Sequence, residues 1–243
     1  MAGFFYNLGK MVGPPVRKGK WVFRSLTGTK AEILKAELEV GQDITREILE
    51  QAEIEPDPDS QKHLCEIGAK LADCLTDKRR HFTFETIAGK EPNAFAVPGG
   101  FIFMNRTLAE LCDWQTDEVA FILAHEMGHV VRGHAIERVL AKFAIGAATK
   151  SAPARGLPAG VLKQIGVRFL ENAYSHNIEL QADEFGARLA DAALYDPYAA
   201  IKLLQRLADW QKTKAGFQLP GYFSSHPPFA ERIANLKQLL HER

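Results

Sequence analysis

The chain has 243 residues, of which 46% are hydrophobic and 25% are charged, values close to those of an ordinary globular protein. Its 30 basic side chains balance 30 acidic ones, so no net positive field favours a nucleic-acid partner, and we expect none. Charged residues interrupt every apolar run before it reaches about 18 residues, which excludes a membrane-spanning helix.

The first 30 residues carry six basic side chains and no acidic one. Lys10 and Arg17 break up the apolar stretch that a secretory signal requires, so we expect a cytoplasmic protein. Basic and aromatic side chains are interleaved in this arm, a composition that suits an anionic membrane surface. Peripheral membrane contact through residues 1–30 is therefore one hypothesis. The alternative is an arm that packs on the domain with solvated charges.

A strongly acidic segment follows the arm. Residues 31–59 contain ten acidic and two basic side chains, and their apolar positions recur with helical spacing. The Pro- and Asp-rich stretch 56–60 ends this helix and caps the next one. We therefore divide the chain into a basic and aromatic arm (1–30), an acidic helix (31–58) and a main domain (59–243).

The main domain begins with an amphipathic helix and continues with three short strands. Residues 82–87 have strand character, and two apolar runs, 94–97 and 101–104, flank Gly99 and Gly100, which predicts a hairpin. Beyond the hairpin the pattern is almost wholly helical. We expect an α+β fold, mostly helical, with one small antiparallel sheet.

The sequence His125-Glu126-Met127-Gly128-His129 has the H-E-x-x-H spacing. On a helix, residues four apart differ by about 40° and about 6 Å, so both imidazoles share one face and can bind one metal ion. Glu126 lies about 100° round the helix from His125, where it can reach a water beside the metal without being a ligand. This is the position of a general base. A chance match on a buried helix is the alternative.

A catalytic zinc site needs three protein ligands and an open fourth position. Glu179 and Asp183 are four residues apart in a second helical segment. Glu179 is the candidate third ligand, and Asp183 is the candidate partner for the second ring nitrogen of His125. Acidic pairs at this spacing are common on solvated helix faces, so the pair indicates a site only together with the H-E-x-x-H sequence.

The order of four motifs resembles that of metallopeptidase family 48, a gluzincin family that includes HtpX-like heat-shock proteases, CAAX prenyl endopeptidases and mitochondrial quality-control relatives. The resemblance covers residues 60–240, approximately. It implies a zincin-type domain with one zinc ion per chain, with His125, His129 and Glu179 as zinc ligands and Glu126 as the catalytic glutamate. The transmembrane segments of the integral-membrane members have no counterpart here, which argues against prenylated substrates. The four motifs are Asn93–Ala96 with Pro98–Gly100, His125–His129, Glu179–Asp183, and His226–Pro228 followed by Glu231–Ile233.

The segment Asn93, Ala94, Phe95 and Ala96 is the candidate substrate-binding strand. Strand alternation places Asn93 and Phe95 on one face and the two small alanines on the other, which leaves room for a close neighbour. An extended peptide added to such an edge strand is held by main-chain hydrogen bonds, largely independent of its sequence. This favours polypeptide substrates with unfolded segments. An ordinary hairpin is the alternative.

His226 precedes two prolines that restrict the loop before the last helix. A lone histidine of this kind is more often solvated or a helix cap than catalytic. Within the family pattern it lies at the rim of the zinc site, where it either donates to the oxyanion or occupies the open zinc position. We favour the oxyanion role, because Arg232 could add positive potential on the substrate side. His134 has no partner at ligand spacing and is expected at the surface or at a helix end.

Together these patterns predict a zinc metalloendopeptidase that hydrolyses peptide bonds in unfolded or misfolded proteins, with no acyl-enzyme intermediate. The competing hypothesis is a catalytically silent, zinc-containing module that binds peptides as a chaperone does. Glu126 discriminates between the two, because a binding module has no need of a carboxylate beside the metal.

Overall fold

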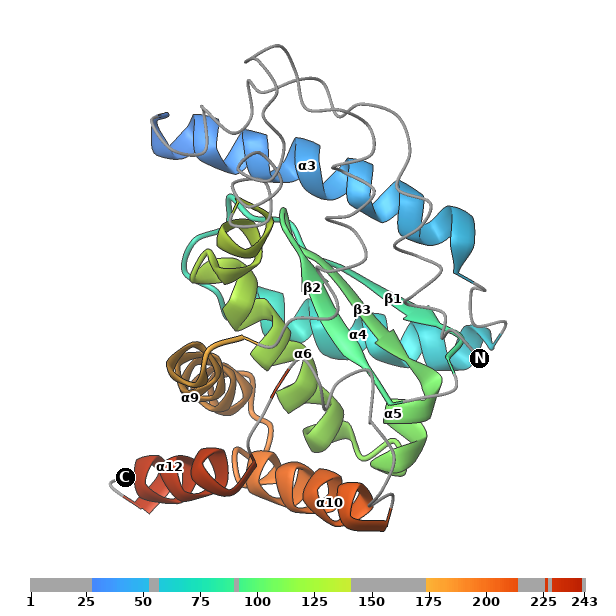
Figure 1. Ribbon diagram of the computed structural model, residues 1–243, viewed down its shortest axis with the longest axis vertical. Helices are drawn as coiled ribbons and strands as arrows, with labels where there is room; N and C mark the ends of the chain where they lie inside the picture. The colour runs from blue at the N-terminus through green and yellow to red at the C-terminus, as the bar shows by residue number, and fades with distance from the viewer. Residues whose placement is uncertain are drawn as a thin grey trace, which may run out of the picture.

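The computed structural model describes residues 28–52, 57–89, 92–140, 174–213, 226 and 229–241. Residues 1–27, and with them all but the last three residues of the proposed membrane-binding arm (1–30), lie outside the described residues. Helices surround one small sheet (Figure 1), which confirms the predicted α+β class. The elements are α3 (Lys30–Gln51), α4 (Pro58–Asp73), β1 (Thr83–Ile87), β2 (Ala94–Val97), β3 (Phe101–Asn105), α5 (Arg106–Leu111), α6 (Thr116–Val131), α9 (His176–Ala192), α10 (Ala199–Thr213) and α12 (Phe229–His241).

Side-chain caps fix the starts of α3 and α4. The Thr29 side chain accepts a hydrogen bond from the Glu32 N–H, and the Glu32 carboxylate accepts one from the Thr29 N–H, so both halves of a capping box are present. Asp57 caps α4 by accepting from the Asp59 N–H, and Pro58 takes the first helical position. The Pro- and Asp-rich stretch therefore caps α4, as predicted, whereas α3 ends earlier, at Gln51.

The sheet has the strand order β1–β3–β2. β2 and β3 are antiparallel, with Ala96 opposite Ile102, and the predicted hairpin turns at Gly99 and Gly100 with φ of +87° and +102°. β1 instead runs parallel to β3, so the sheet is mixed and the prediction of an antiparallel sheet is wrong. β1 bypasses β2, its neighbour in sequence, and pairs with the strand that runs in its own direction. The pattern within one strand carries no information about that choice.

The two faces of the sheet are buried in different apolar clusters. Ala94, Ala96 and Met104 belong to the main core, which also contains the apolar sides of α4 and α6. Phe95 and Phe103 stack on the other face, with 5.2 Å between ring centroids, in a second cluster that includes α3. In Figure 1, α3 lies across one end of the sheet, while α10 and α12 lie at the opposite end of the molecule. The alternation predicted for residues 93–97 therefore separates the two cores.

α6 and α9 approach each other closely, because each carries a glycine at their contact. A Cβ atom on Gly186 of α9 would lie 3.0 Å from the backbone nitrogen of His125. A Cβ atom on Gly128 of α6 would lie 3.1 Å from the ring of Phe185. Small residues at a crossing shorten the distance between helix axes, which depends on the side chains at the contact. This contact lets side chains of the two helices meet directly.

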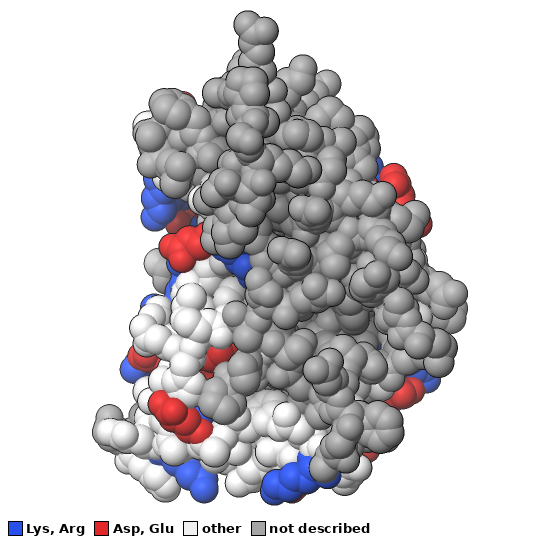
Figure 2. Space-filling view, in the orientation of Figure 1, with Lys and Arg blue, Asp and Glu red and all other residues white. Residues whose placement is uncertain are grey.

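The described residues have the short apolar runs and the mixed charges that the composition predicts. None of the described helices has the combination of length and apolar character that a bilayer crossing requires. On the face drawn in Figure 2, acidic and basic side chains of the described residues are interspersed rather than gathered by sign. The three cysteines are free thiols: Cys65, Cys74 and Cys112.

Backbone-to-backbone contact joins α3 to the hairpin. A Cβ atom on Gly41 would lie 1.7 Å from the carbonyl oxygen of Pro98, and one on Gly99 would lie 2.9 Å from the Cα of Leu38. Neither neighbour is the end of a flexible side chain, so neither can move aside cheaply. The docking of α3 therefore depends on the absence of a side chain at Gly41.

Gly41→Ala should displace α3 from the hairpin and lower the free energy of unfolding by about 3 kcal/mol, at the upper end of the overpacking range. Urea denaturation followed by circular dichroism measures this change. Gln42→Ala, at the exposed neighbouring position, is the control and should stay within about 0.5 kcal/mol of wild type. Equal stability of Gly41→Ala and wild type would contradict the close packing of α3.

Candidate metal centre

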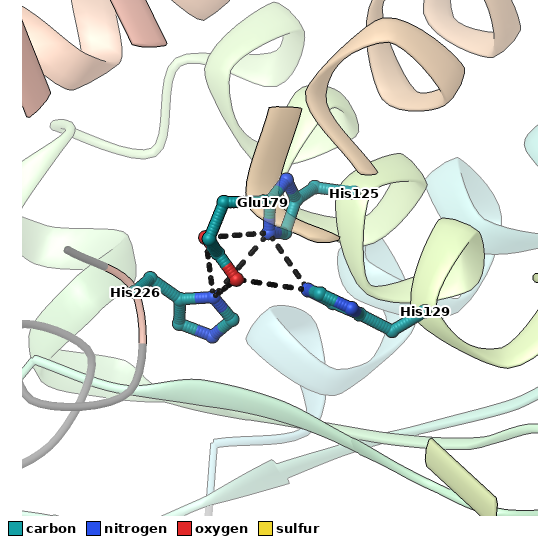
Figure 3. Close-up of side chains that lie close together, drawn as sticks. All are labelled: His125, His129, Glu179 and His226. Carbon is teal, nitrogen blue, oxygen red and sulfur yellow. Dashed lines mark hydrogen bonds and ion pairs between the residues drawn. The ribbon is translucent and has the colours of Figure 1, made fainter. Parts of the chain in front are cut away.

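The H-E-x-x-H residues lie in a stretch of α6 that is buried on all sides. His125 and His129 project from the same side of the helix, and their Nε2 atoms are 3.2 Å apart. Figure 3 shows both imidazoles directed toward the same small region as Glu179 and His226. The helical geometry predicted from the spacing is therefore present.

α9 brings Glu179 to these imidazoles across the close contact between the two helices. Its Oε1 lies 3.4 Å from Nε2 of His129, and its Oε2 lies 3.7 Å from Nε2 of His125. The fold thus brings together the three residues that the sequence selects as ligands.

His226, just before α12, completes the group. Its Nδ1 lies 2.9 Å from each carboxylate oxygen of Glu179 and 3.4 Å from Nε2 of His125. The ligand atoms of His125, His129, Glu179 and His226 all lie within 4.8 Å of one another, and all four residues are buried. The sequence places His226 at the rim of the site, whereas the structure places its Nδ1 inside the ligand group.

Asp183 holds the far side of His125. Its Oδ1 lies 2.9 Å from Nδ1 of His125, the pairing expected from the four-residue spacing on α9. Burial lowers the pKa of His125, but the hydrogen bond and charge of Asp183, together with the charge of Glu179, outweigh burial and raise this pKa. A carboxylate partner of this kind makes an imidazole a better metal ligand and fixes its tautomer.

Arg232 of α12 lies behind the ligands. Its Nε and Nη2 donate to the two oxygens of Asp183 at 2.8 and 2.7 Å, and its Nη1 lies 3.1 Å from Oε2 of Glu179. The sequence predicts Arg232 on the substrate side. In the structure its guanidinium is fully buried and bound to these two carboxylates, so it balances their charge instead.

The rings of Tyr174 and His134 flank His129. The sequence does not predict the contact between His134 and His129. Tyr174 stacks on the imidazole with 4.0 Å between centroids and 12° between planes. Nδ1 of His134 lies 3.1 Å from Nδ1 of His129. His134 begins the helical segment 134–140, in agreement with the predicted helix end, but it is only 6% exposed, so the predicted surface position is wrong. Gly133, with φ of +82°, ends α6 and turns the chain before the helical segment 134–140. Helical periodicity therefore cannot relate His134 to His129.

Burial and charge favour metal-binding protonation states in two of the ligands. Burial lowers the pKa of His129 well below its usual value, despite a hydrogen bond with Glu179. Burial raises the pKa of Glu179, but the charges of His226 and Arg232, together with hydrogen bonds from His129 and His226, outweigh burial and hold this pKa well below its usual value. A neutral imidazole and an ionised carboxylate are the forms that bind a metal.

The spacing and charge of the group fit a divalent metal ion. Tetrahedral ligands at about 2.0–2.1 Å from zinc are about 3.3 Å apart, close to the 3.2, 3.4 and 3.7 Å that separate the imidazole and carboxylate atoms. Three buried carboxylates, Glu126, Glu179 and Asp183, surround the group with one buried guanidinium, that of Arg232, among the described residues. Two negative formal charges are left, which a divalent cation would balance.

Two carboxylates at this group are not among the four ligand candidates: Asp183, which is bound to His125 and Arg232, and Glu126. Both oxygens of Glu126 are buried, and neither has a hydrogen-bond partner among the described residues. Nε2 of His226 lies 3.4 Å from Oε1 of Glu126. Buried polar atoms without partners are rare and often have a chemical role.

The candidate substrate strand runs beside α6. Within the described part of the chain, β2 has β3 on one side and no strand on the other, so it is an edge strand. Its alanines, Ala94 and Ala96, share the core with α6, whereas Phe95 lies in the α3 cluster. The Asn93 N–H donates to Oδ1 of Asn105 at 2.9 Å, and Oδ1 of Asn93 is buried without a described partner.

Comparison with known proteins identifies the family. The model of Peptidase family M48 matches residues 58–240, well over half of the chain. The chain belongs to this family. Among M48 relatives, it is 32% identical over 154 residues to the mitochondrial metalloendopeptidase OMA1 of Schizosaccharomyces pombe, which covers 62% of this chain and 44% of the relative. It is 29% identical over 160 residues to the metalloprotease LoiP of Escherichia coli, and this match covers 63% of this chain and 61% of the relative.

A third M48 relative is the beta-barrel assembly-enhancing protease of Escherichia coli. It is 24% identical over 212 residues, which cover 83% of this chain and 43% of the relative. The chain spans about half the length of these curated relatives. The M48 match begins at the first residue of α4, so α3 precedes the matched region.

Arg232→Met should lower the free energy of unfolding of the metal-free protein by about 3–5 kcal/mol, because Asp183 and Glu179 would lose their buried cation. Urea denaturation in the presence of a chelator measures this loss. Arg188→Met is the matched control, since Arg188 pairs with Glu184 on the exposed side of α9 and should change stability by less than about 0.5 kcal/mol. Similar stabilities of the two variants would contradict the role of Arg232 in charge balance.

Proposed function

We propose that this M48 protein is a zinc-dependent metalloendopeptidase that cleaves peptide bonds in unfolded or misfolded proteins. The observation that carries the proposal is the buried carboxylate of Glu126, without a described hydrogen-bond partner, beside the ligand group on α6 and α9. The metallopeptidase names of the M48 relatives support the reaction class. The proposed peptidase domain is 59–243.

His125, His129 and Glu179 would hold the metal, through two imidazole nitrogens and a carboxylate oxygen. A bound zinc ion supplies a Lewis acid that polarises the scissile carbonyl and makes water more acidic. Asp183 and Arg232 keep the ligands in place from behind.

Glu126 moves the protons of the reaction. Its carboxylate accepts a proton from the attacking water, and the oxygen of that water forms a bond to the carbonyl carbon. Glu126 then returns the proton to the amine nitrogen as the peptide C–N bond breaks. No covalent intermediate with the protein forms, so none of the three cysteines takes part.

The edge strand β2 supports a peptide substrate. A peptide that extends along β2 is held by main-chain hydrogen bonds, which select for extended backbone rather than for sequence. The buried Oδ1 of Asn93 is an acceptor at the start of that strand. The small side chains of Ala94 and Ala96 let β2 pack closely against α6, and Phe95 anchors the strand to the sheet. These features favour unfolded segments over folded proteins as substrates.

The position of His226 bears on the two roles that the sequence leaves open. Its Nδ1 lies among the ligand atoms, 3.4 Å from Nε2 of His125. The sequence favours the oxyanion role because Arg232 could add positive potential on the substrate side. In the structure Arg232 binds Asp183 and Glu179 instead. These contacts support a blocking role, in which the imidazole stands at the fourth ligand position and leaves before a substrate carbonyl enters.

Two further proposals rest on the sequence alone. A cytoplasmic location follows from the composition of the N-terminal segment, and peripheral contact with anionic lipid follows from its interleaved aromatic and basic residues. Flotation of the full chain with anionic liposomes, compared with a chain that starts at Lys30, tests the lipid contact.

Glu126→Gln should abolish casein cleavage and leave zinc bound, whereas Glu179→Ala should release zinc. Metal analysis of the purified variants and casein cleavage with and without a chelator separate these roles. Glu184→Ala, on the same helix and half-exposed, is the control and should keep both zinc and activity. Asp183→Ala should lose about 10- to 100-fold in zinc affinity or activity.

Full zinc affinity in Glu179→Ala would contradict the ligand assignment. If wild type and Glu126→Gln are equally inert while zinc binds stoichiometrically, the peptide-binding module is the better description. In that case the carboxylate of Glu126 has no catalytic part.

His226→Ala should cleave casein at saturating zinc as fast as wild type or faster, because the fourth ligand position would be free. His241→Ala, at the exposed end of α12, is the matched control. A loss of about 10²- to 10³-fold in turnover would instead identify His226 as an oxyanion donor.

A further inference from the structure

The stack of Tyr174 on His129 fixes the plane of the imidazole but not the direction of its nitrogens. The planes are 12° from parallel, and the guanidinium of Arg138 lies 4.4 Å from the centroid of the Tyr174 ring. Half a turn about the Cβ–Cγ bond of His129 would preserve this stack while it exchanged each ring nitrogen with a carbon. A second contact must decide which edge of the ring faces the ligand group.

His134 supplies that contact. Its Nδ1 lies 3.1 Å from Nδ1 of His129, while Nε2 of His129 faces Nε2 of His125 at 3.2 Å. Two ring nitrogens at this distance form a hydrogen bond only when one carries a proton and the other does not. A metal on Nε2 of His129 requires the proton of that ring to be on Nδ1. Nδ1 of His134 must then be the acceptor, with the proton of its own ring on Nε2.

We infer that His134 is a positioning residue for His129: its Nδ1 accepts the Nδ1–H of His129 and keeps the Nε2 lone pair of His129 on the metal. The inference rests on the proposed function, because it requires a metal at His129. His125 has a different arrangement, in which the carboxylate of Asp183 takes the partner role at 2.9 Å. One imidazole ligand therefore has an anionic partner and the other a neutral one.

The fold holds His134 in this position. The helical segment 134–140 also carries Ile136 and Val139, which are buried in the cluster beneath α3. His134 itself is only 6% exposed. The imidazole is thus held in place by the burial of its own helical segment.

His134→Asn and His134→Leu test the inference as a pair. The two side chains have the same branched shape, but only the Asn carbonyl can accept the Nδ1–H of His129 from the place of Nδ1 in His134. We expect His134→Leu to bind zinc about 10- to 100-fold more weakly than wild type, and His134→Asn to stay within about 3-fold. Competition with a chromophoric zinc chelator measures affinity. Thermal unfolding of the metal-free variants checks that both fold alike.

A second measurement needs no substitution. In zinc-loaded wild-type protein with isotope-labelled histidine, heteronuclear NMR should find the His129 proton on Nδ1 and the His134 proton on Nε2. A proton on Nδ1 of His134 would overturn the inference, as would zinc binding by His134→Leu equal to that of wild type or of His134→Asn. The proposed function survives these results. Wild-type protein that binds no zinc would overturn both.

Discussion

The balance of buried charge is the constraint on which the centre of this structure depends. Glu126, Glu179 and Asp183 are removed from water, and burial of a carboxylate without compensation is strongly unfavourable. Arg232 compensates part of this charge through direct contacts with Asp183 and Glu179. The remainder explains why the α6–α9 contact suits a cation: the fold concentrates negative charge and donor atoms at a point that apolar side chains enclose.

Local sequence patterns predict much of this centre because helix geometry is local. The spacing of His125 and His129 fixes their common face, and the spacing of Glu179 and Asp183 predicts one residue toward the ligands and one behind. The hairpin at Gly99 and Gly100 follows from turn chemistry in the same way. Family resemblance adds the pairing of α6 with α9, which no local pattern contains.

The features that sequence reasoning misses depend on contacts between distant segments. β1 pairs with β3 rather than with β2. The alternation of side chains within a strand does not encode which strand is its neighbour. His134 reaches His129 across the chain reversal at Gly133, and the partner of Arg232 lies 49 residues away. A charged side chain near a predicted active site suggests substrate contact, yet its role depends on which neighbours the fold places around it.

The helical segment 134–140 contacts both α3 and the metal centre. One side of it packs with Ala36 and Val40 of α3, and its first residue, His134, contacts a ligand candidate of the metal centre. Removal of α3 would therefore loosen the support of His129. Thermodynamic linkage makes such coupling reciprocal: metal binding favours the docked α3 by the same free energy with which docked α3 favours the metal. A partner that captures α3 would thus act as an allosteric effector of metal affinity, although it never approaches the ligands.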